Sequence, residues 1–275
     1  MDGAGQRRGL TWLAAGAAAG AAAVALALPP IAQDPGYHAF ADRRALLGVP
    51  NVANVVSNLP FLVVGALGLA AVRRGAVVVR EPWERRAWGL VFGGAAATGL
   101  GSAWYHWAPA NATLVWDRLP ITLVLMALFA LVIGERLDPR AGRRLLPWLL
   151  AAGAASVAWW HASEAAGRGD LRFYGLVQFF PLVAIPALLA ARAPAYTRGA
   201  DLVVALGWYA GAKLFEHFDA AVWAAGGVTG GHALKHLASA TALAWLLWMV
   251  RRRAFSAPAG PASPASASPG GAPRG

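Results

Sequence analysis

Three histidines are the residues of this sequence that are best suited to hold a metal ion. His232 and His236 lie four positions apart in the stretch GGHALKHL, so on a helix both imidazoles share one face, one turn apart. His106 ends a distant apolar run. The chain has no cysteine, and three histidines with an open fourth position are the ligand set of a catalytic zinc, whereas structural zinc is usually closed by cysteine. The pattern therefore predicts a catalytic metal site if the fold brings these two parts of the chain together.

Two further polar residues lie near His106, in the stretch GSAWYHWAPANATLVWDRLP. Ser102 precedes His106 by one helical turn on the same face, and its hydroxyl can donate to an oxyanion. Asp117 follows His106 by 11 residues and can hold a metal-activated water and receive its proton. Structural alternatives exist for each. Ser102 can bond to the carbonyl one turn back, and His106 can belong to an interfacial aromatic belt. Asp117 can cap a helix or pair with Arg118.

The composition is that of an integral membrane protein. Of the 275 residues, 58% are hydrophobic and only 13% are charged, and the mean hydropathy is +0.49. The net charge of +11 comes from arginines that stand in pairs and triplets between apolar runs, which is the placement that sets membrane topology. We therefore expect the membrane as a partner and no nucleic acid.

Eight apolar segments have about the length that a helix needs to cross the hydrocarbon core. The first, residues 10–30, is rich in alanine and follows Arg7 and Arg8, so it is either a membrane helix or a signal peptide. The other seven lie near residues 54–72, 87–107, 113–134, 145–162, 171–191, 200–218 and 230–250. The expected fold is an all-α polytopic membrane helical bundle with a seven-helix core and this extra N-terminal segment. The expected domains are residues 1–30 for that segment, 31–253 for the bundle and 254–275 for a disordered tail of Ala, Pro, Ser and Gly.

Arginine-rich connections alternate with arginine-poor ones along the chain. The basic connections are residues 73–86 and 135–144, and those without arginine are residues 108–112 and 219–229. The basic side is cytoplasmic by the positive-inside rule, so the C-terminus is expected on the cytoplasmic side. The expected location is the plasma (inner) membrane. His106, Asp117 and the two C-terminal histidines then fall within one or two helical turns of the opposite, non-cytoplasmic face. A lipid reaches a site at that depth most easily from the bilayer.

The combined spacing resembles that of a known family. Ser-x3-His, an aspartate 11 residues after that histidine, and His-x3-His on the last of seven helices are similar to the alkaline ceramidases, which belong to a superfamily of seven-helix membrane hydrolases that includes the adiponectin-receptor-like proteins. The stretch NVVSNLPFLVVG at residues 54–65 supports the resemblance, which covers residues 40–250. It implies zinc held by His106, His232 and His236, and a water beside Asp117 with Ser102 assisting at the oxyanion. It also implies an amidase that cleaves a ceramide-like lipid to a sphingoid base and a fatty acid.

The resemblance also implies a calcium site, which the sequence supports poorly. Eukaryotic members carry an acidic stretch before the first family helix. The residues here that match it in part are Asp42, Asn51, Asn54 and Asn58. Asn51 stands where an acidic residue is expected, so calcium is the weaker of the two cofactor expectations. A function of another class, a receptor-like or transport protein whose histidine cluster binds metal or senses protons, fits the same residues. The sequence leaves the oligomeric state and the acyl chain specificity open.

A few charged residues and histidines remain inside or beside the apolar segments. Lys213, Glu216 and Asp219 share a helix face, which predicts a structural ion pair or, alternatively, a role beside the metal or a lipid head group. His161 and His217 are expected at the membrane interface, although either could replace one of the proposed ligands.

Overall fold

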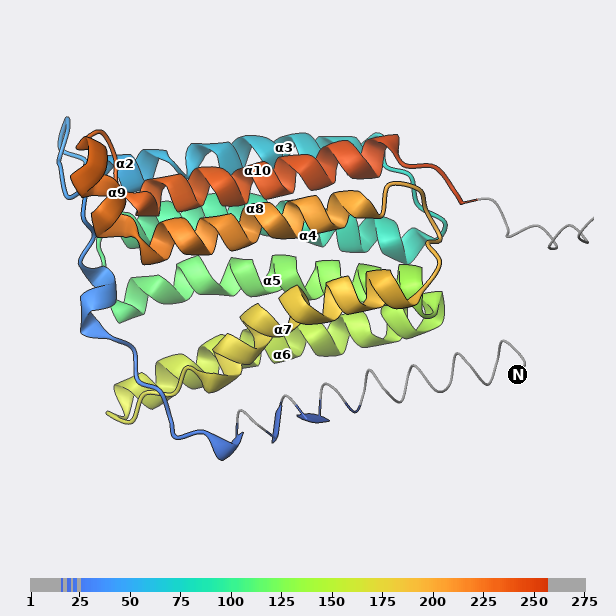
Figure 1. Cartoon of the computed structure of the whole chain (residues 1–275), viewed down its shortest axis with the longest axis horizontal. Coiled ribbons are helices and arrows are strands. Elements are labelled where there is room, and N and C mark those ends of the chain that lie inside the picture. Colours follow the sequence, from blue (N-terminus) through green and yellow to red (C-terminus); the bar gives the residue numbers. More distant parts are fainter. Residues whose placement is uncertain (1–15, 17–18, 21, 24–25, 257–275) are drawn as a thin grey trace, which may run out of the picture.

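The computed structural model describes residues 16, 19–20, 22–23 and 26–256, and its folded part is a bundle of helices (Figure 1). The long helices are α3 (Leu59–Arg73), α4 (Pro82–Trp107), α5 (Asn111–Arg136), α6 (Pro139–Ala165), α7 (Arg172–Ala191), α8 (Ala200–His217) and α10 (Gly231–Arg252). The short ones are η1 (Pro35–His38), α2 (Val52–Val56) and α9 (Asp219–Gly226). Each long helix corresponds to one of the seven apolar segments, so the predicted all-α bundle is confirmed.

Two helices begin well before their apolar runs. α4 starts at Pro82 and α6 at Pro139, because proline at a first helical position gives up no needed hydrogen bond and its φ angle is already helical. Asp138 caps α6 by accepting a hydrogen bond from the Ala141 N–H at 3.1 Å. The first turns of these helices carry arginine, so the apolar pattern alone predicts a later start.

α5 is the central helix of one side of the bundle. It lies between α4 and α6 and also contacts α7, and 83% of its most apolar window is buried, against 28% for α7. On the other side of the bundle, α10 packs against α8 and α3. The two sides meet through α3 and α4, so α7 and α8 face each other at the edge of the bundle (Figure 1).

Four stretches of the described chain are long and apolar enough to cross a membrane. They are Val52–Arg73, Asn111–Arg136, Arg172–Ala191 and Gly231–Arg252. α8 is of similar length but carries Asp201, Lys213 and Glu216, and all three have oppositely charged partners. Pairing of this kind is what allows charged side chains inside a membrane helix. The chain is therefore a membrane protein.

The helix ends that carry the three histidines lie at one end of the bundle, opposite the arginine-rich connections (Figure 1). That end is covered by α9, α2 and the segment around η1 (Figure 1). Most of the N-terminal segment 10–30, and the predicted tail from residue 257 onward, lie outside the described residues. Residues 254–256 are described, and they pair with residues 195–197, for example through Thr197 N–H to the Ala254 carbonyl at 2.8 Å.

Candidate metal centre

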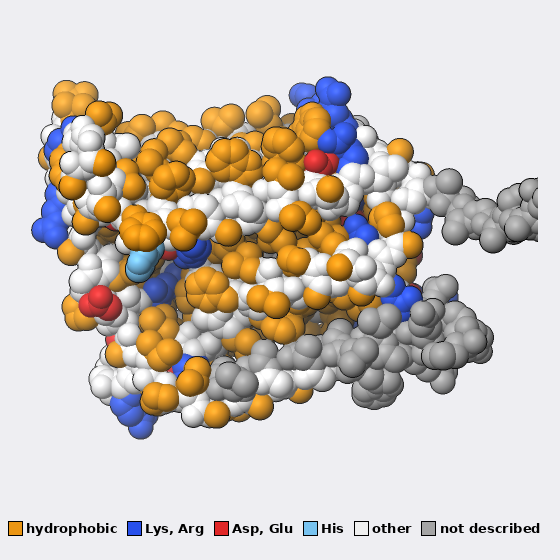
Figure 2. Space-filling view, in the orientation of Figure 1, with side chains coloured by type: hydrophobic (Ala, Val, Ile, Leu, Met, Phe, Trp, Pro, Cys, Tyr) orange, Lys and Arg blue, Asp and Glu red, His pale blue; other side chains and the backbone are white. Residues whose placement is uncertain are grey.

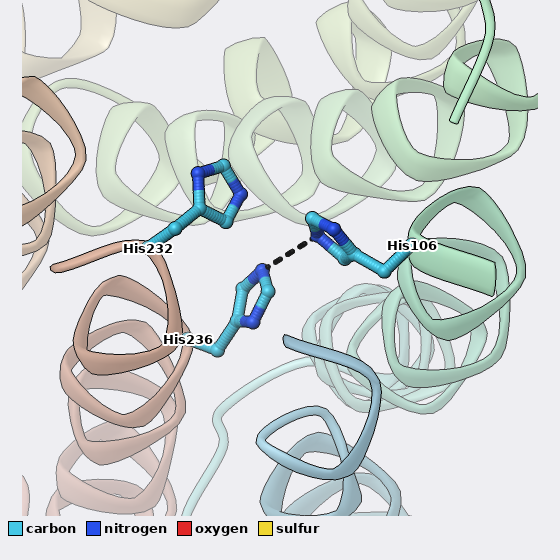
Figure 3. Close-up of side chains that lie close together, drawn as sticks. All are labelled: His106, His232 and His236. Carbon is cyan, nitrogen blue, oxygen red and sulfur yellow. Dashed lines mark hydrogen bonds between the residues drawn. The ribbon is translucent and has the colours of Figure 1, made fainter. Parts of the chain in front are cut away.

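The three predicted histidines come together at one end of the bundle. His106 lies in the last turn of α4, and His232 and His236 lie in the first two turns of α10 (Figure 3). One ring nitrogen from each lies within 4.8 Å of the others, and the Nε2 atoms of His106 and His236 are 3.2 Å apart. In a tetrahedral zinc site each nitrogen lies about 2.0–2.1 Å from the ion. Two such nitrogens are then separated by roughly the distance seen between the Nε2 atoms of His106 and His236. All three rings are buried, so the cluster fits a single metal ion.

A close helix crossing holds His106 in place. A Cβ added to Gly101 would lie 1.9 Å from the Trp116 carbonyl oxygen, so only glycine permits α4 and α5 to approach this closely. That contact lies one residue from Ser102 and one residue from Asp117. The crossing therefore sets the separation of the two helices that carry His106 and Asp117.

The start of α10 is fixed by a second close contact and by an aspartate. A Cβ on Gly231 would lie 2.2 Å from the Phe215 carbonyl oxygen, which brings α10 against α8. Asp219 accepts hydrogen bonds from the His232 N–H and from the Ala41 N–H, both at 2.9 Å. One carboxylate thus ties the first turn of α10 to the N-terminal segment.

Ser57 orients His236. Its hydroxyl donates to the Asn54 carbonyl at 3.0 Å and lies 2.8 Å from His236 Nδ1. With Nε2 of His236 as a metal ligand, its Nδ1 carries the ring proton and donates to the Ser57 hydroxyl. Metal-binding histidines usually have their other nitrogen held in this way. Sequence reasoning assigned Ser57 no role, although it lies in the stretch 54–65.

Phe40 is a second residue that the sequence did not reveal. Its ring centroid lies 4.6 Å from that of His106 and 4.8 Å from that of His232, and its side chain is 3% exposed. It therefore shields the cluster from the aqueous side. An isolated phenylalanine in a polar stretch gives no periodic signal, so only the fold could reveal it.

Ser102 and Asp117 line the same cavity as His236. The Ser102 hydroxyl is buried and has no hydrogen-bond partner among the described residues. Thr98, one turn earlier, donates its hydroxyl to the Gly94 carbonyl at 2.9 Å. This bond to the carbonyl one turn back is the structural role that was the alternative for Ser102, and Ser102 does not form it. Asp117 lies in the second turn of α5, away from the capping position, and forms no ion pair with Arg118. Both side chains are thus free to meet a ligand.

The cavity runs from the histidines toward the middle of the bundle. Its wall near the cluster is polar, and its deeper wall is apolar, with Leu128, Ile185, Leu243 and Leu246. Its volume is about 250 Å³. α7 contributes Tyr174 and Gln178 and α8 contributes residues from Leu202 to Glu216, and the face between these helices is hollowed in Figure 2. The cavity thus lies between these two helices, with its polar end beside His236.

A network of charges adjoins the cluster. Glu216 accepts hydrogen bonds from Lys213 and Lys235, both at 2.7 Å, and from the Tyr37 hydroxyl at 2.9 Å. Lys235 also lies 3.1 Å from His232 Nε2. Desolvation, together with Glu216 and Asp117 nearby, raises the pKa of the Tyr37 phenol, so it stays protonated and serves as a donor.

Some of the remaining expectations hold and others do not. Lys213 and Glu216 form the predicted ion pair, but Asp219 does not join it and binds backbone N–H groups. His161 and His217 are exposed and lie outside the cluster. Neither replaces one of the three histidines.

Of the four residues that could match a calcium site, Asp42, the one carboxylate, is already engaged by an arginine. Both carboxylate oxygens of Asp42 accept hydrogen bonds from Arg44, at 2.9 and 2.7 Å, and this pairing lowers the pKa of Asp42. Arg44 also donates to the Val228 carbonyl at 2.6 Å. Asn51 uses its side-chain N–H₂ on the His106 carbonyl, and Asn54 directs its own to the Asp42 carbonyl. Arg44 thus engages both carboxylate oxygens of Asp42, whereas the Oδ1 atoms of Asn54 and Asn58 are buried without a hydrogen-bond partner among the described residues.

The fold and site define a class: a membrane helical bundle with a three-histidine cluster at the polar end of a largely apolar cavity. The family model described as Ceramidase matches residues 48–250. The chain therefore belongs to the ceramidase family. No curated protein and no solved structure matches the chain. The family consists of hydrolases of the ceramide amide bond, which favours an enzyme over the receptor-like or transport alternative.

Proposed function

We propose that this chain is a zinc-dependent amidase that cleaves ceramide-like lipids to a sphingoid base and a fatty acid. The observation that carries the proposal is the cluster of three buried histidines at the polar end of an apolar cavity. Imidazole ligands without cysteine, and with a fourth position left open, suit a catalytic zinc. A zinc ion at this place would supply a Lewis acid and an acidified water.

The residues around the cluster have separate roles in this proposal. His106, His232 and His236 hold the ion, and Ser57 fixes the orientation of His236. Asp117 accepts a proton from the attacking water and returns it to the leaving amine nitrogen. Ser102 donates its unpaired hydroxyl to the carbonyl oxygen as negative charge develops there. The apolar depth of the cavity holds the hydrocarbon chains and keeps bulk water away.

The proposed membrane orientation follows from the two ends of the bundle. The connections with arginine face the cytoplasm, the C-terminus is cytoplasmic, and the site lies near the non-cytoplasmic face of the plasma membrane. The substrate enters sideways between α7 and α8, because neither helix closes the cavity there. A lipid can then reach the histidines without leaving the bilayer.

Metal and product analysis on the same preparations tests the proposal. Purified wild type should contain an equimolar amount of zinc and should release fatty acid and sphingoid base from ceramide. His232→Ala should lose both zinc and activity, while His217→Ala, an exposed histidine on α8, should keep both. Zinc-replete protein that releases no fatty acid, or activity that persists in His232→Ala, would contradict the proposal.

A further inference from the structure

The polar end of the cavity carries more positive than negative charge. The cations that line it are Lys213, Lys235 and Arg118, and the carboxylates that line it are Asp117 and Glu216. Glu216 is already engaged by the two lysines and by Tyr37. Arg118 is the cation in this wall that has no carboxylate partner among the described residues.

Arg118 is deeply buried for an unpaired guanidinium. Its side chain is 4% exposed, and one nitrogen, Nη2, donates to the Gln33 side-chain oxygen at 2.5 Å. Its Nε and Nη1 have no hydrogen-bond partner in the part of the chain that the structure describes. The guanidinium carbon lies 4.1 Å from the ring centroid of Trp160 and 4.6 Å from that of Tyr174. These cation–π contacts offset part of the cost of burial, but they do not supply the oxygen acceptors that a guanidinium prefers.

Arg118 lies close to where the reaction would occur. It follows Asp117 directly on α5, and both side chains line the cavity. The Tyr37 ring, whose hydroxyl binds Glu216, lies 5.7 Å from the guanidinium carbon. With the hydrocarbon chains in the deep apolar part, the head group of the amine half remains at this polar end. An anionic group a few bonds from the amide nitrogen would therefore lie beside Arg118.

We infer, on the basis of the amidase function proposed above, that the preferred substrate is an N-acyl lipid whose amine half carries an anionic oxygen group near the amide, and that Arg118 recognises that group. A phosphate ester and a carboxylate share this chemistry, because both accept charge-assisted hydrogen bonds from a guanidinium. A neutral ceramide fits the same cavity but leaves Arg118 unpaired.

Substrate selectivity tests the inference. The full-length protein in detergent is given three lipids with the same N-acyl chain: ceramide, ceramide 1-phosphate and N-acylserine. The wild type should cleave at least one anionic lipid with a kcat/KM about tenfold or more above that of ceramide, as one or two charge-assisted hydrogen bonds would produce. The two anionic lipids separate a phosphate preference from a carboxylate preference. A wild type that prefers ceramide to both would overturn the inference while leaving the proposed amidase intact.

Arg118→Gln shows whether this residue is responsible. Its KM for the anionic lipid should rise about tenfold or more, with kcat/KM for ceramide changed by less than about threefold. Arg118→Lys, which keeps the charge, should retain part of the selectivity. The matched control is Arg136→Gln at the other end of α5. Arg136 is also buried, at 8% exposed, but it donates to the Arg192 carbonyl and is not part of the cavity wall. If Arg118→Gln lowered kcat/KM equally for anionic and neutral lipids, Arg118 would have a structural role and the inference would be wrong.

A binding measurement keeps the test independent of catalysis. Dodecyl phosphate should raise the unfolding temperature of the wild type and of Arg136→Gln, but not that of Arg118→Gln, and dodecanol should act alike on all three. If the wild type cleaves no lipid, the amidase proposal fails, and this measurement still decides whether Arg118 binds an anion. An identical response of Arg118→Gln and wild type to dodecyl phosphate would refute the role of Arg118.

Discussion

The two ends of the bundle both bury charged side chains, but they satisfy them differently. At the arginine-rich end, Arg253 donates to Glu135 and lies 3.9 Å from Glu84, which in turn accepts from the Tyr196 hydroxyl. At the histidine end, the Ser102 hydroxyl, His106 Nδ1 and two nitrogens of Arg118 have no partner among the described residues. At the first end Arg253 is paired with carboxylates, although its Nη2 and the Nε of Arg136 have no hydrogen-bond partner among the described residues. At the second end the unpartnered groups of Ser102 and Arg118 adjoin a cavity. We call the first the closed end and the second the open end.

Arg253 and Arg118 make the comparison direct. Both lie over aromatic rings, Arg253 at 3.8 Å from the Tyr196 centroid and Arg118 at 4.1 Å from that of Trp160. Only Arg253 also has a carboxylate. A buried charge therefore does not by itself mark a functional site in this protein, whereas incomplete pairing next to a cavity does.

The largest expected effect on catalysis is that of Asp117→Asn at the open end. Removing the proposed base should lower kcat by roughly a thousandfold, which lies within the range for general base catalysis. Zinc content and unfolding temperature should match the wild type, since Asp117 forms no ion pair in the structure. Fatty acid release and metal analysis provide both readouts. A parallel loss of zinc would instead make Asp117 part of the metal site.

At the closed end, Arg253→Met should act on stability alone. It leaves Glu135 and Glu84 buried without their cation, and breaking a buried pair costs about 3–5 kcal/mol. The unfolding temperature in detergent should fall, while kcat of the folded fraction stays near that of the wild type. The double variant Arg253→Met with Glu135→Gln should recover part of the loss. A drop in kcat without a fall in the unfolding temperature would show that Arg253 contributes to catalysis, which contradicts the distinction between the two ends.

Ser57→Ala tests a smaller contribution to the open end. It removes the acceptor for His236 Nδ1, and changes of this kind cost about 10–100-fold in metal affinity. Zinc affinity measured by chelator competition should fall accordingly, and saturating zinc should restore most of the activity. Ser163→Ala is the matched control, because Ser163 also donates to a backbone carbonyl, that of Trp160, but lies away from the histidines. Unchanged zinc affinity in Ser57→Ala would remove its proposed role.

Ser57 also shows where sequence reasoning stops. Helix length and spacing predicted the seven long helices and the meeting of His106 with the His232–His236 pair, because both depend on local periodicity and on which end of the bundle each helix reaches. The partners of those residues depend on long-range contacts. Ser57 meets His236 from 179 positions away. The pairing of Asp42 with Arg44 is local, but the hydrogen bond of Arg44 to the Val228 carbonyl depends on the fold.

The smallest expected effect concerns Asp170, in the connection before α7. Arg172 hydrogen-bonds its carboxylate and, with a further bond from Trp159, lowers the pKa of Asp170 to about 2 despite burial. Because the folded pKa lies below the ordinary value of about 3.9, this carboxylate stabilises the fold above about pH 4, and the contribution disappears as the pH falls toward 2. Asp170→Asn should therefore lower the unfolding temperature at pH 7 and flatten its decline between pH 4 and 2. Asp34→Asn, at an exposed aspartate, should leave that decline unchanged, and equal acid profiles for wild type and Asp170→Asn would show that this pair does not stabilise the histidine end.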